Sequence, residues 1–535
     1  MSTLKCLATT VAAALLVFPL PLSARASSNA QPVKSADTTV DLVVNGEVIS
    51  AEAVRRELVY RLGAREIEAR KLELFLRTEI EQRGLKIEDL IQASDVDTVI
   101  KDNRAKMKEE YGGELTEEEI LANSNIDLEG WRNNTRLMLL FNKLFIPENP
   151  DEWPEVTRMA LEESIPEGQR EMFMQKMREG FAARQAAGDS KAADDPQRMM
   201  FNMMLRGPIQ ASLEEAANIK TAQDGIPAEI AMIVHGVEIR TDEIFNSLPT
   251  AVSETEWQRT RMWLAKTVAV RQALEKQGAF MNDKAFDEVW TELESKYAES
   301  FIPLEQLVIS FKHFPSMSAY RTFYRGAESY RNLIKDEIND ENLTKHLERA
   351  NRLMGLEQVD ADVILLSAYD FRLARWKDNG WEEAKQRAID VSSKLANGGD
   401  WSELLVANSD YWDTPTPASQ RGQAQQGSRN NHGQFGLKNR NSLLPMVHEN
   451  DYQIFLAGTS VGDTIFFDTE IGSMGGPYKG TYGYYIVRVN NRVPANKSYS
   501  LADANHRESI VHDYLQVRFT QFAAKAIAEA DVQGL

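Results

Sequence analysis

The chain has 535 residues, of which 26% are charged and 43% are hydrophobic, and its net charge is −19. This length suits three or four globular domains of roughly 100 to 200 residues each. The excess of acidic residues makes nucleic acid and anionic lipid poor partners, and no nucleic acid is expected to bind, because binding phosphate requires clustered lysines and arginines.

The first 26 residues have the pattern of a secretory leader. Lys5 precedes an apolar run from Cys6 to Leu22 that two prolines interrupt, and Ala24-Arg25-Ala26 follows. The pattern predicts cleavage after about Ala26 and no stable membrane insertion afterwards. The alternative is an uncleaved anchor, although a spanning helix needs about 20 apolar residues and few prolines. Cys6 is the only cysteine, so the mature chain is expected to hold no disulfide and no cysteine nucleophile.

A hairpin motif occurs twice. Residues 42–49 place Asn45-Gly46 between β-branched residues, which is the strongest short-range hairpin signal. Residues 231–239 carry His235-Gly236 as a weaker copy. Each motif opens a long helical segment, and helix-ending glycines follow at nearly the same offset, at Gly84 and Gly278. The near-constant offset indicates a duplicated module.

A methionine-rich stretch separates the two copies. It contains Met172, Met174, Met177, Met199, Met200, Met203 and Met204. Methionine is flexible and polarizable, so one interpretation is a surface that accepts many apolar partners. The other is a helical linker whose methionines pack on a neighbouring domain.

After Asp362 the sequence pattern changes from helical to a mixture of helices and strands (α+β). Val363-Ile364-Leu365-Leu366 is predicted to be a buried strand, and residues 382–395 an amphipathic helix. Strands are also predicted over residues 464–467 and 484–489. Residues 445–455 are predicted to be helical, and residues 414–431 form a polar insertion. The last helix has an apolar stripe that we expect to dock on a helical domain.

The predicted fold class is therefore multidomain and mainly α, with two helical modules that each open on a short β-hairpin, an α+β domain and a C-terminal helix. The predicted division is a leader (1–26), a disordered segment (27–39), helical module 1 (40–149), a Met-rich helical linker (150–228), helical module 2 (229–340), an α+β domain (355–495) and a C-terminal helix (500–535).

The order of these elements resembles the SurA and PrsA family of exported chaperones, which carry parvulin-type (PpiC) peptidyl-prolyl isomerase domains. The resemblance touches most of the chain after the leader. Its motifs are Val43 to Ser50 with the helix ending at Gly84, Asn342 to Ala350 leading into Val363 to Leu366, Gly398-Gly399-Asp400-Trp401, Gly433-Gln434-Phe435-Gly436, Leu456-Ala457-Gly458, Gly476-Pro477-Tyr478 and Gly483 to Val489.

The resemblance implies where a proline site would lie. The family frames this site with two strand histidines, whose positions are filled here by Val363 and Tyr485. An aspartate or cysteine position falls on Tyr411, with Asp410 beside it. Tyr411, Tyr485 and Asp410 are thus the candidate catalytic residues. The candidate substrate-binding residues are Val363 and two residues at positions where the family surrounds the proline ring, Met446 and Phe455.

Prolyl isomerisation makes and breaks no σ-bond. Its barrier is roughly 18 to 20 kcal/mol of lost amide resonance, which an enzyme lowers by holding the twisted amide better than the planar one. A nucleophile is not strictly needed, so the loss of both family histidines leaves the activity open. No cofactor is implied. No metal site is predicted either, because none of the seven histidines has the spacing of a metal-binding pair: His235, His313, His346, His432, His448, His506 and His512.

Three functional hypotheses remain at this stage. The first is a periplasmic folding chaperone that binds unfolded or extended client polypeptides, including proline-containing peptides, with a weak or inactive isomerase domain. The second is a fully active parvulin-type peptidyl-prolyl isomerase. The third is a structural scaffold whose methionines and pocket residues only pack.

Overall fold

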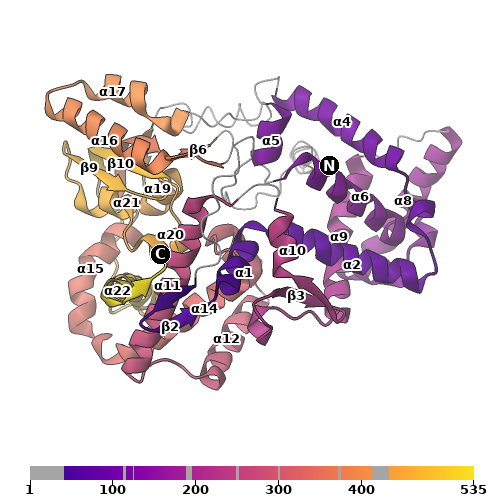
Figure 1. The fold of residues 1–535 in the computed structure, drawn as a ribbon, viewed down its shortest axis with the longest axis horizontal. Helices are drawn as coiled ribbons and strands as arrows, with labels where there is room; N and C mark the ends of the chain where they lie inside the picture. Colours follow the sequence, from indigo (N-terminus) through magenta and orange to yellow (C-terminus); the bar gives the residue numbers. More distant parts are fainter. Residues whose placement is uncertain are drawn as a thin grey trace. The chain divides into compact units, whose positions relative to one another are not determined.

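The computed structural model describes residues 41–111, 116–123, 126–187, 196–248, 252–298, 300, 302–371, 375–412 and 433–535. These residues are mainly helical and carry small antiparallel sheets (Figure 1), which confirms the predicted mainly-α class. They fall into two compact units, one built on the described residues between 62 and 248 and one on residues 41–61 with the described residues from 252 to 535. The predicted leader, residues 27–39, the insertion 414–431 and His432 lie outside the described residues. No helix in the described ranges is long and apolar enough to cross a membrane.

The first unit is a helical assembly with one hairpin. Its elements are α2 (Ala64–Gln82), α3 (Ile87–Leu90), α4 (Ala93–Tyr111), α5 (Glu117–Asn123), α6 (Leu128–Phe145), η2 (Pro150–Glu152), α7 (Glu155–Ser164), α8 (Glu167–Ala187), α9 (Pro196–Ala216), η4 (Ala222–Asp224), β3 (Ile230–Val234), β4 (Val237–Arg240) and α10 (Thr241–Asn246).

The second unit begins with a hairpin and continues as helices. Its helical part comprises β1 (Leu42–Val44), β2 (Glu47–Ile49), α1 (Ala51–Leu62), α11 (Glu254–Lys276), α12 (Asp283–Ala298), α13 (Leu304–Gln306), η5 (Leu307–Phe311), α14 (Met317–Leu333), η6 (Lys335–Glu337), α15 (Asp340–Met354), α22 (Ala504–Glu529) and β11 (Val532–Gln533).

An α+β part, hereafter the sheet domain, lies between α15 and α22 in sequence. It contains β5 (Gln358–Ser367), β6 (Tyr369–Asp370), β7 (Arg375–Trp376), α16 (Gly380–Ala396), α17 (Trp401–Asn408), η7 (Asp410–Trp412), β8 (Gln434–Lys438), α19 (Arg440–Met446), α20 (Asp451–Ala457), α21 (Val461–Asp463), η8 (Thr464–Asp468), β9 (Met474–Lys479) and β10 (Gly483–Val493).

Both predicted hairpins are present. Asn45 and Gly46 have φ of 49° and 84°, and His235 and Gly236 have φ of 52° and 77°. Positive φ at both central residues is what a two-residue type I′ turn requires. Glycine accepts this backbone without strain, and asparagine and histidine tolerate it better than most residues.

The two predicted helix ends share one capping geometry. After α2, Gly84 donates its N–H to the Glu81 carbonyl and the next N–H binds the Ile80 carbonyl. After α11, Gly278 donates to Glu275 and the next N–H binds the Leu274 carbonyl. Each set is a Schellman motif with glycine at positive φ, so the repeated glycines mark the same local structure.

Each hairpin packs on the long helix that follows the other hairpin in sequence. In the second unit, Leu42 and Val44 are buried against α11 residues Ala265 and Ala269, and β1 also pairs with β11. In the first unit, β3 lies beside α2, where the His235 ring meets the Phe75 ring edge-on at 5.9 Å. Local sequence predicted both hairpins but not their packing partners.

The methionine-rich stretch forms α8 and α9 rather than an extended connection. Met177 is buried, and Met174 and Met204 pack on the core of the first unit. Met172 and Met203 are exposed. The packing interpretation therefore holds for Met174, Met177 and Met204, whereas partner binding by the exposed methionines stays a prediction.

The sheet domain is built on a four-stranded antiparallel sheet with strand order β8-β5-β10-β9. The predicted strand Val363–Leu366 lies in β5 and is fully buried. Helices α16 and α17 cover one face of the sheet (Figure 1), where Val391 and Trp401 pack on Ile364 and Ile486. The other face is covered by α19, α21 and η8.

The predicted strand 464–467 is wrong, because these residues form the π-helical turn η8. The carbonyls of Ile465 and Phe466 accept hydrogen bonds from Arg492, and Arg352 also donates to Phe466. These guanidinium groups satisfy backbone oxygens that a strand partner would otherwise bind. The predicted helix 445–455 is divided into α19 and α20 by residues 447–450.

The C-terminal helix is α22, and it docks on the helical part of the second unit as its apolar stripe predicted. Ile510, Tyr514, Phe519 and Ala523 are buried in one core with residues of α11, α14 and α15. The Phe519 ring packs against Phe323 of α14 and Phe455 of α20. This core therefore joins helices that are distant in sequence.

Candidate functional site

The two positions that the family fills with histidine lie on one face of the sheet and are closed to solvent. Val363 and Tyr485 are each 0% exposed and belong to the same apolar core. The Tyr485 hydroxyl donates to the Val447 carbonyl at 3.1 Å. Burial raises the pKa of Tyr485 well above its usual value, so the phenol stays protonated as a donor. Neither side chain presents surface to a peptide.

Asp410 is held in an ionic network. Its carboxylate accepts the backbone N–H of Ser367 at 2.6 Å and two N–H groups of Arg387 at 2.8 and 3.0 Å. The Lys377 ammonium lies 3.9 Å away. These contacts tie η7 to β5 and α16, which is a structural role for the carboxylate.

Tyr411 and Met446 lie near Tyr485. Both are partly buried against the core that contains Val363 and Tyr485. The Tyr411 hydroxyl is buried and has no hydrogen-bond partner among the described residues. Four of the six predicted site residues therefore share one cluster. Their assignment to a proline site stays a prediction.

Phe455 lies elsewhere. Its ring packs on Trp263, Phe323 and Phe519, with centroid distances of 5.4, 5.0 and 5.9 Å. Tyr452, three residues earlier on α20, contacts the same helical core, as helical spacing requires. The structure thus does not bring Phe455 to Met446, although the resemblance places both around one proline ring.

Sequence reasoning did not group His448 with the aromatic residues that surround it. Its ring is stacked between Phe371, at 4.8 Å, and Tyr411, at 5.6 Å, and the Tyr482 ring meets it edge-on at 5.4 Å. We call Phe371, Tyr411, His448 and Tyr482 the ring stack. These residues come from four separate segments with no shared spacing, so no sequence signal connects them.

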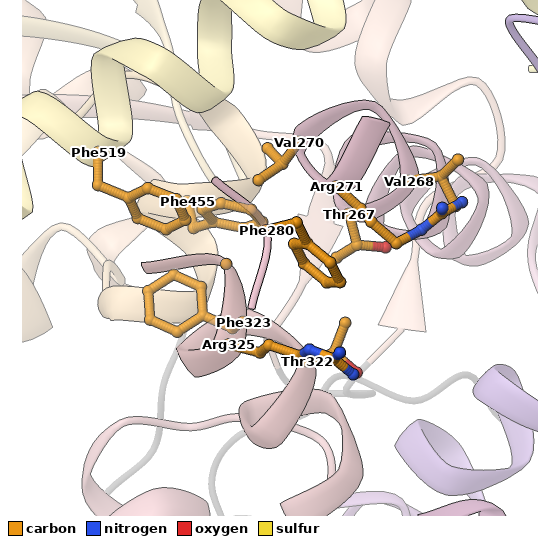
Figure 2. Close-up of a pocket in the computed structure, with 11 residues that line it drawn as sticks. Thr267, Val268, Val270, Arg271, Phe280, Thr322, Phe323, Arg325, Phe455 and Phe519 are labelled. Carbon is orange, nitrogen blue, oxygen red and sulfur yellow. The ribbon is translucent and has the colours of Figure 1, made fainter. Parts of the chain in front are cut away.

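A cavity of about 210 Å³ lies in the helical part of the second unit (Figure 2). Its walls come from α11, α14, α20, α22 and the segment after α11. Four phenylalanine rings dominate these walls, and exposed Thr322 brings the cavity to the surface. Gly326 adds no side chain to the wall. The four rings are those of Phe280, Phe323, Phe455 and Phe519.

Two arginines line the cavity beside these rings, and both are paired. Arg325 bonds Asp283 at 2.8 Å and the Met281 carbonyl, and its guanidinium lies 4.5 Å from the centre of the Phe280 ring. Arg271 bonds Glu275 at 2.9 Å and also pairs with Glu47 of β2. Since each guanidinium already has a carboxylate, the cavity offers mainly apolar surface to a ligand.

Lys266 lies behind one wall of the cavity and is only 1% exposed. Its ammonium donates to the Phe455 carbonyl at 2.5 Å and lies 5.0 Å from the centre of the Phe455 ring. The carbonyls at the end of α20 carry partial negative charge, which favours a cation there. Burial nevertheless lowers the pKa of Lys266 from 10.5 to about 8.

The described residues contain no group of three or more histidine, cysteine, aspartate or glutamate side chains that could hold a metal ion.

No protein-family model and no curated protein matches the chain. The chain is similar to solved structures of the peptidyl-prolyl isomerase PrsA. PrsA from Bacillus anthracis is 15% identical, with a TM-score of 0.21, over 50% of this chain and 94% of that one. PrsA from Bacillus cereus is 14% identical, with a TM-score of 0.20, over 56% and 90%. TM-scores of this size carry no information about the chemistry of the site.

Proposed function

We propose that the protein is a folding factor that binds unfolded or extended polypeptides through the apolar cavity of its helical part. In this proposal the sheet domain has weak or no peptidyl-prolyl isomerase activity. The observation that carries the proposal is the phenylalanine-lined cavity between α11, α14, α20 and α22. The leader-like pattern of residues 1–26 supports a periplasmic place of action.

The size of the cavity fits one apolar side chain. An apolar cavity of about 150 Å³ is large enough to bind benzene, and this cavity is about 210 Å³. Burying one large apolar side chain yields about 1.5 to 3 kcal/mol. That is less than the roughly 4 kcal/mol of a millimolar complex. A client would therefore bind through several such contacts and be released easily, which suits a folding factor.

The packing of the sheet domain supports weak isomerase activity. An isomerase must contact the twisted amide more favourably than the planar one. Val363 and Tyr485 are fully buried, and the Tyr485 hydroxyl is bonded to backbone. Asp410 is bonded to Ser367 and Arg387. None of these three groups offers a free contact to a substrate.

A fully active isomerase is the second candidate, and Tyr411 is the observation that favours it. Its buried hydroxyl has no partner among the described residues, and burial keeps it protonated by raising its pKa. A proline-peptide isomerisation assay on the whole protein separates the two candidates. A rate well above the uncatalysed one would favour the active enzyme.

The test of the folding-factor proposal is suppression of the aggregation of a denatured outer-membrane-type protein. Thr322→Trp would place an indole at the cavity mouth. Thr344→Trp on α15 is a matched control, because both threonines are exposed and both donate to the carbonyl four residues earlier. We expect the Thr322→Trp protein to lose most of the suppression and the Thr344→Trp protein to keep it. Equal suppression by both variants, or none by the unmodified protein, would contradict the proposal.

A further inference from the structure

Lys266 is a buried cation that forms no ion pair with the described residues. Its hydrogen bond goes to a backbone oxygen, the Phe455 carbonyl, at 2.5 Å. Burying a lysine without a carboxylate is costly, because the charged form loses its water. Such a group is a candidate for a functional role where it borders a binding site.

The immediate surroundings of Lys266 are apolar. Helix α11 packs on α14, α20, α22 and β1, and β1 carries no charged side chain. A Cβ built on Gly458, at the end of α20, would lie 3.4 Å from the Lys266 ammonium and 3.3 Å from Ala524 of α22. The amine therefore lies among small and aromatic side chains.

The charged side chains of the neighbouring helices are paired elsewhere or exposed. Glu508, near the start of α22, is exposed. Two uncharged titratable groups, Tyr452 and His512, lie near cations other than Lys266, namely Arg61 and Lys312. The pairs among the described residues are Arg321 with Asp287, Arg325 with Asp283, Arg331 with Glu328, Asp451 with Lys312, Arg507 with Asp340, Asp513 with His346, Arg518 with Glu337, and Lys525 with Glu529.

Phe455 connects Lys266 to the cavity. Phe455 lines the cavity, whereas Lys266 does not (Figure 2). The Lys266 ammonium binds the carbonyl of Phe455 and lies 5.0 Å from the centre of its ring. The same ring packs on Phe323 and Phe519, which form two further walls. A change in the charge of Lys266 therefore acts directly on a wall of the cavity.

The proton of Lys266 determines how strongly the amine holds Phe455. An ammonium group attracts both an aromatic ring and the carbonyl oxygens at a helix end. A neutral amine loses the attraction to the ring and binds the carbonyl more weakly. Burial lowers the pKa of Lys266 from 10.5 to about 8, which brings this change close to neutral pH.

We propose that Lys266 regulates the cavity as a proton-sensitive support of its Phe455 wall. When the amine carries its proton, the ring is held at the wall and the cavity admits an apolar group. When the proton is lost, the ring is released and turns into the cavity, which then binds an apolar group less tightly. The proton is exchanged with water, and no bond other than the N–H bond of Lys266 forms or breaks. This inference rests on the proposed function, since it concerns the same cavity.

The test is the affinity of the full chain for fluorobenzene, measured by fluorine NMR at about pH 6.5 and about pH 9.5, on either side of the change. Fluorobenzene has no ionisable group and is close in size to benzene, which a cavity of about 150 Å³ admits. We expect the unmodified protein to bind it about fivefold more weakly at the higher pH, as the loss of one cation–π contact implies.

Three variants assign the pH dependence to Lys266. Lys266→Met keeps an apolar chain of similar length without the charge, so it should show the lower affinity at both pH values. Lys266→Arg stays charged at both and should show the higher affinity throughout. Lys276→Met, on the exposed last turn of α11, is the matched control and should bind like the unmodified protein. Circular dichroism at both pH values shows that each protein is folded.

Equal affinity of the unmodified protein at the two pH values, or an unchanged pH dependence in Lys266→Met, would overturn this inference and leave the proposed function standing. Thr322→Trp is expected to abolish fluorobenzene binding at both pH values. No binding by the unmodified protein, or equal binding by Thr322→Trp, would overturn the inference together with the proposed role of the cavity. The two failures are therefore distinguishable.

Discussion

The core around Tyr485 and the cavity beside Phe455 are both apolar and aromatic, but Tyr485 is fully buried, whereas the cavity reaches the surface at Thr322. In the sheet domain, a Cβ added to Gly480 would lie 2.5 Å from the Tyr485 ring. In the helical part, a Cβ added to Gly326 would meet Phe519 and Val270 at an ordinary 3.4 Å. Residue type alone therefore does not make a binding site. What distinguishes the two regions is whether neighbouring side chains already fill the space.

The largest expected difference between the regions follows from removing a ring. Tyr485→Ala should lower the free energy of unfolding by about 3 to 5 kcal/mol, because it leaves a void in a closed core. Phe323→Ala should cost clearly less, since Phe323 is half-buried and already borders a cavity. Urea denaturation of the two variants measures both effects. Equal losses would mean that the two regions are packed alike.

The second difference concerns charge, because a buried cation lies behind the cavity wall. The pKa of Lys266 is lowered from 10.5 to about 8, so between these values the folded chain binds fewer protons than the unfolded chain. The free energy of unfolding should therefore rise between pH 8 and pH 10.5, and Lys266 should contribute on the order of 3 kcal/mol to this rise. Lys266→Met should remove that rise, whereas Lys276→Met, on the exposed last turn of α11, should keep it.

Urea denaturation at several pH values gives the difference between each variant and the unmodified protein, which separates Lys266 from other titrating groups. If the free energy of unfolding of Lys266→Met depends on pH as steeply as that of the unmodified protein, Lys266 is not buried away from water as it is in the structure.

Features that depend on local sequence could be predicted. Asn45-Gly46 and His235-Gly236 lie where the backbone has positive φ, which few residues accept. These short motifs therefore predicted the hairpins. The same holds for the glycine caps after α2 and α11, and for the apolar run Val363–Leu366, which became a buried strand. Each of these features depends on residues that are close together in the sequence.

Features that depend on distant segments could not be predicted. The ring stack draws on residues from 371 to 482, and the cavity on residues from 267 to 519. Motif alignment placed Phe455 beside Met446, but a break at residues 447–450 reorients α20 toward the helical core. The predicted strand 464–467 failed for a similar reason, since Arg352 and Arg492 bind its carbonyls from outside the segment.

The smallest expected effect gives the sharpest comparison. A glycine-to-alanine substitution should raise the free energy of unfolding in one region and lower it in the other. Gly326 lies inside α14, where glycine costs about 0.5 to 1 kcal/mol relative to alanine. Gly326→Ala should therefore stabilise the protein by about that amount, since the new methyl makes only ordinary contacts. Gly480→Ala should instead destabilise it by about 1 to 3 kcal/mol, because the ring of Tyr485 cannot move away.

The same pair of variants connects packing to function. The methyl group in Gly326→Ala enters the cavity wall between Phe519 and Val270, so a more stable protein should suppress client aggregation less well. Gly480→Ala, which leaves the cavity walls unchanged, should keep its suppression per folded molecule. Urea denaturation supplies the stabilities and the aggregation assay supplies the activities. A Gly326→Ala protein that gains stability without losing suppression would show that clients bind outside the cavity, because its volume would then have no bearing on their capture.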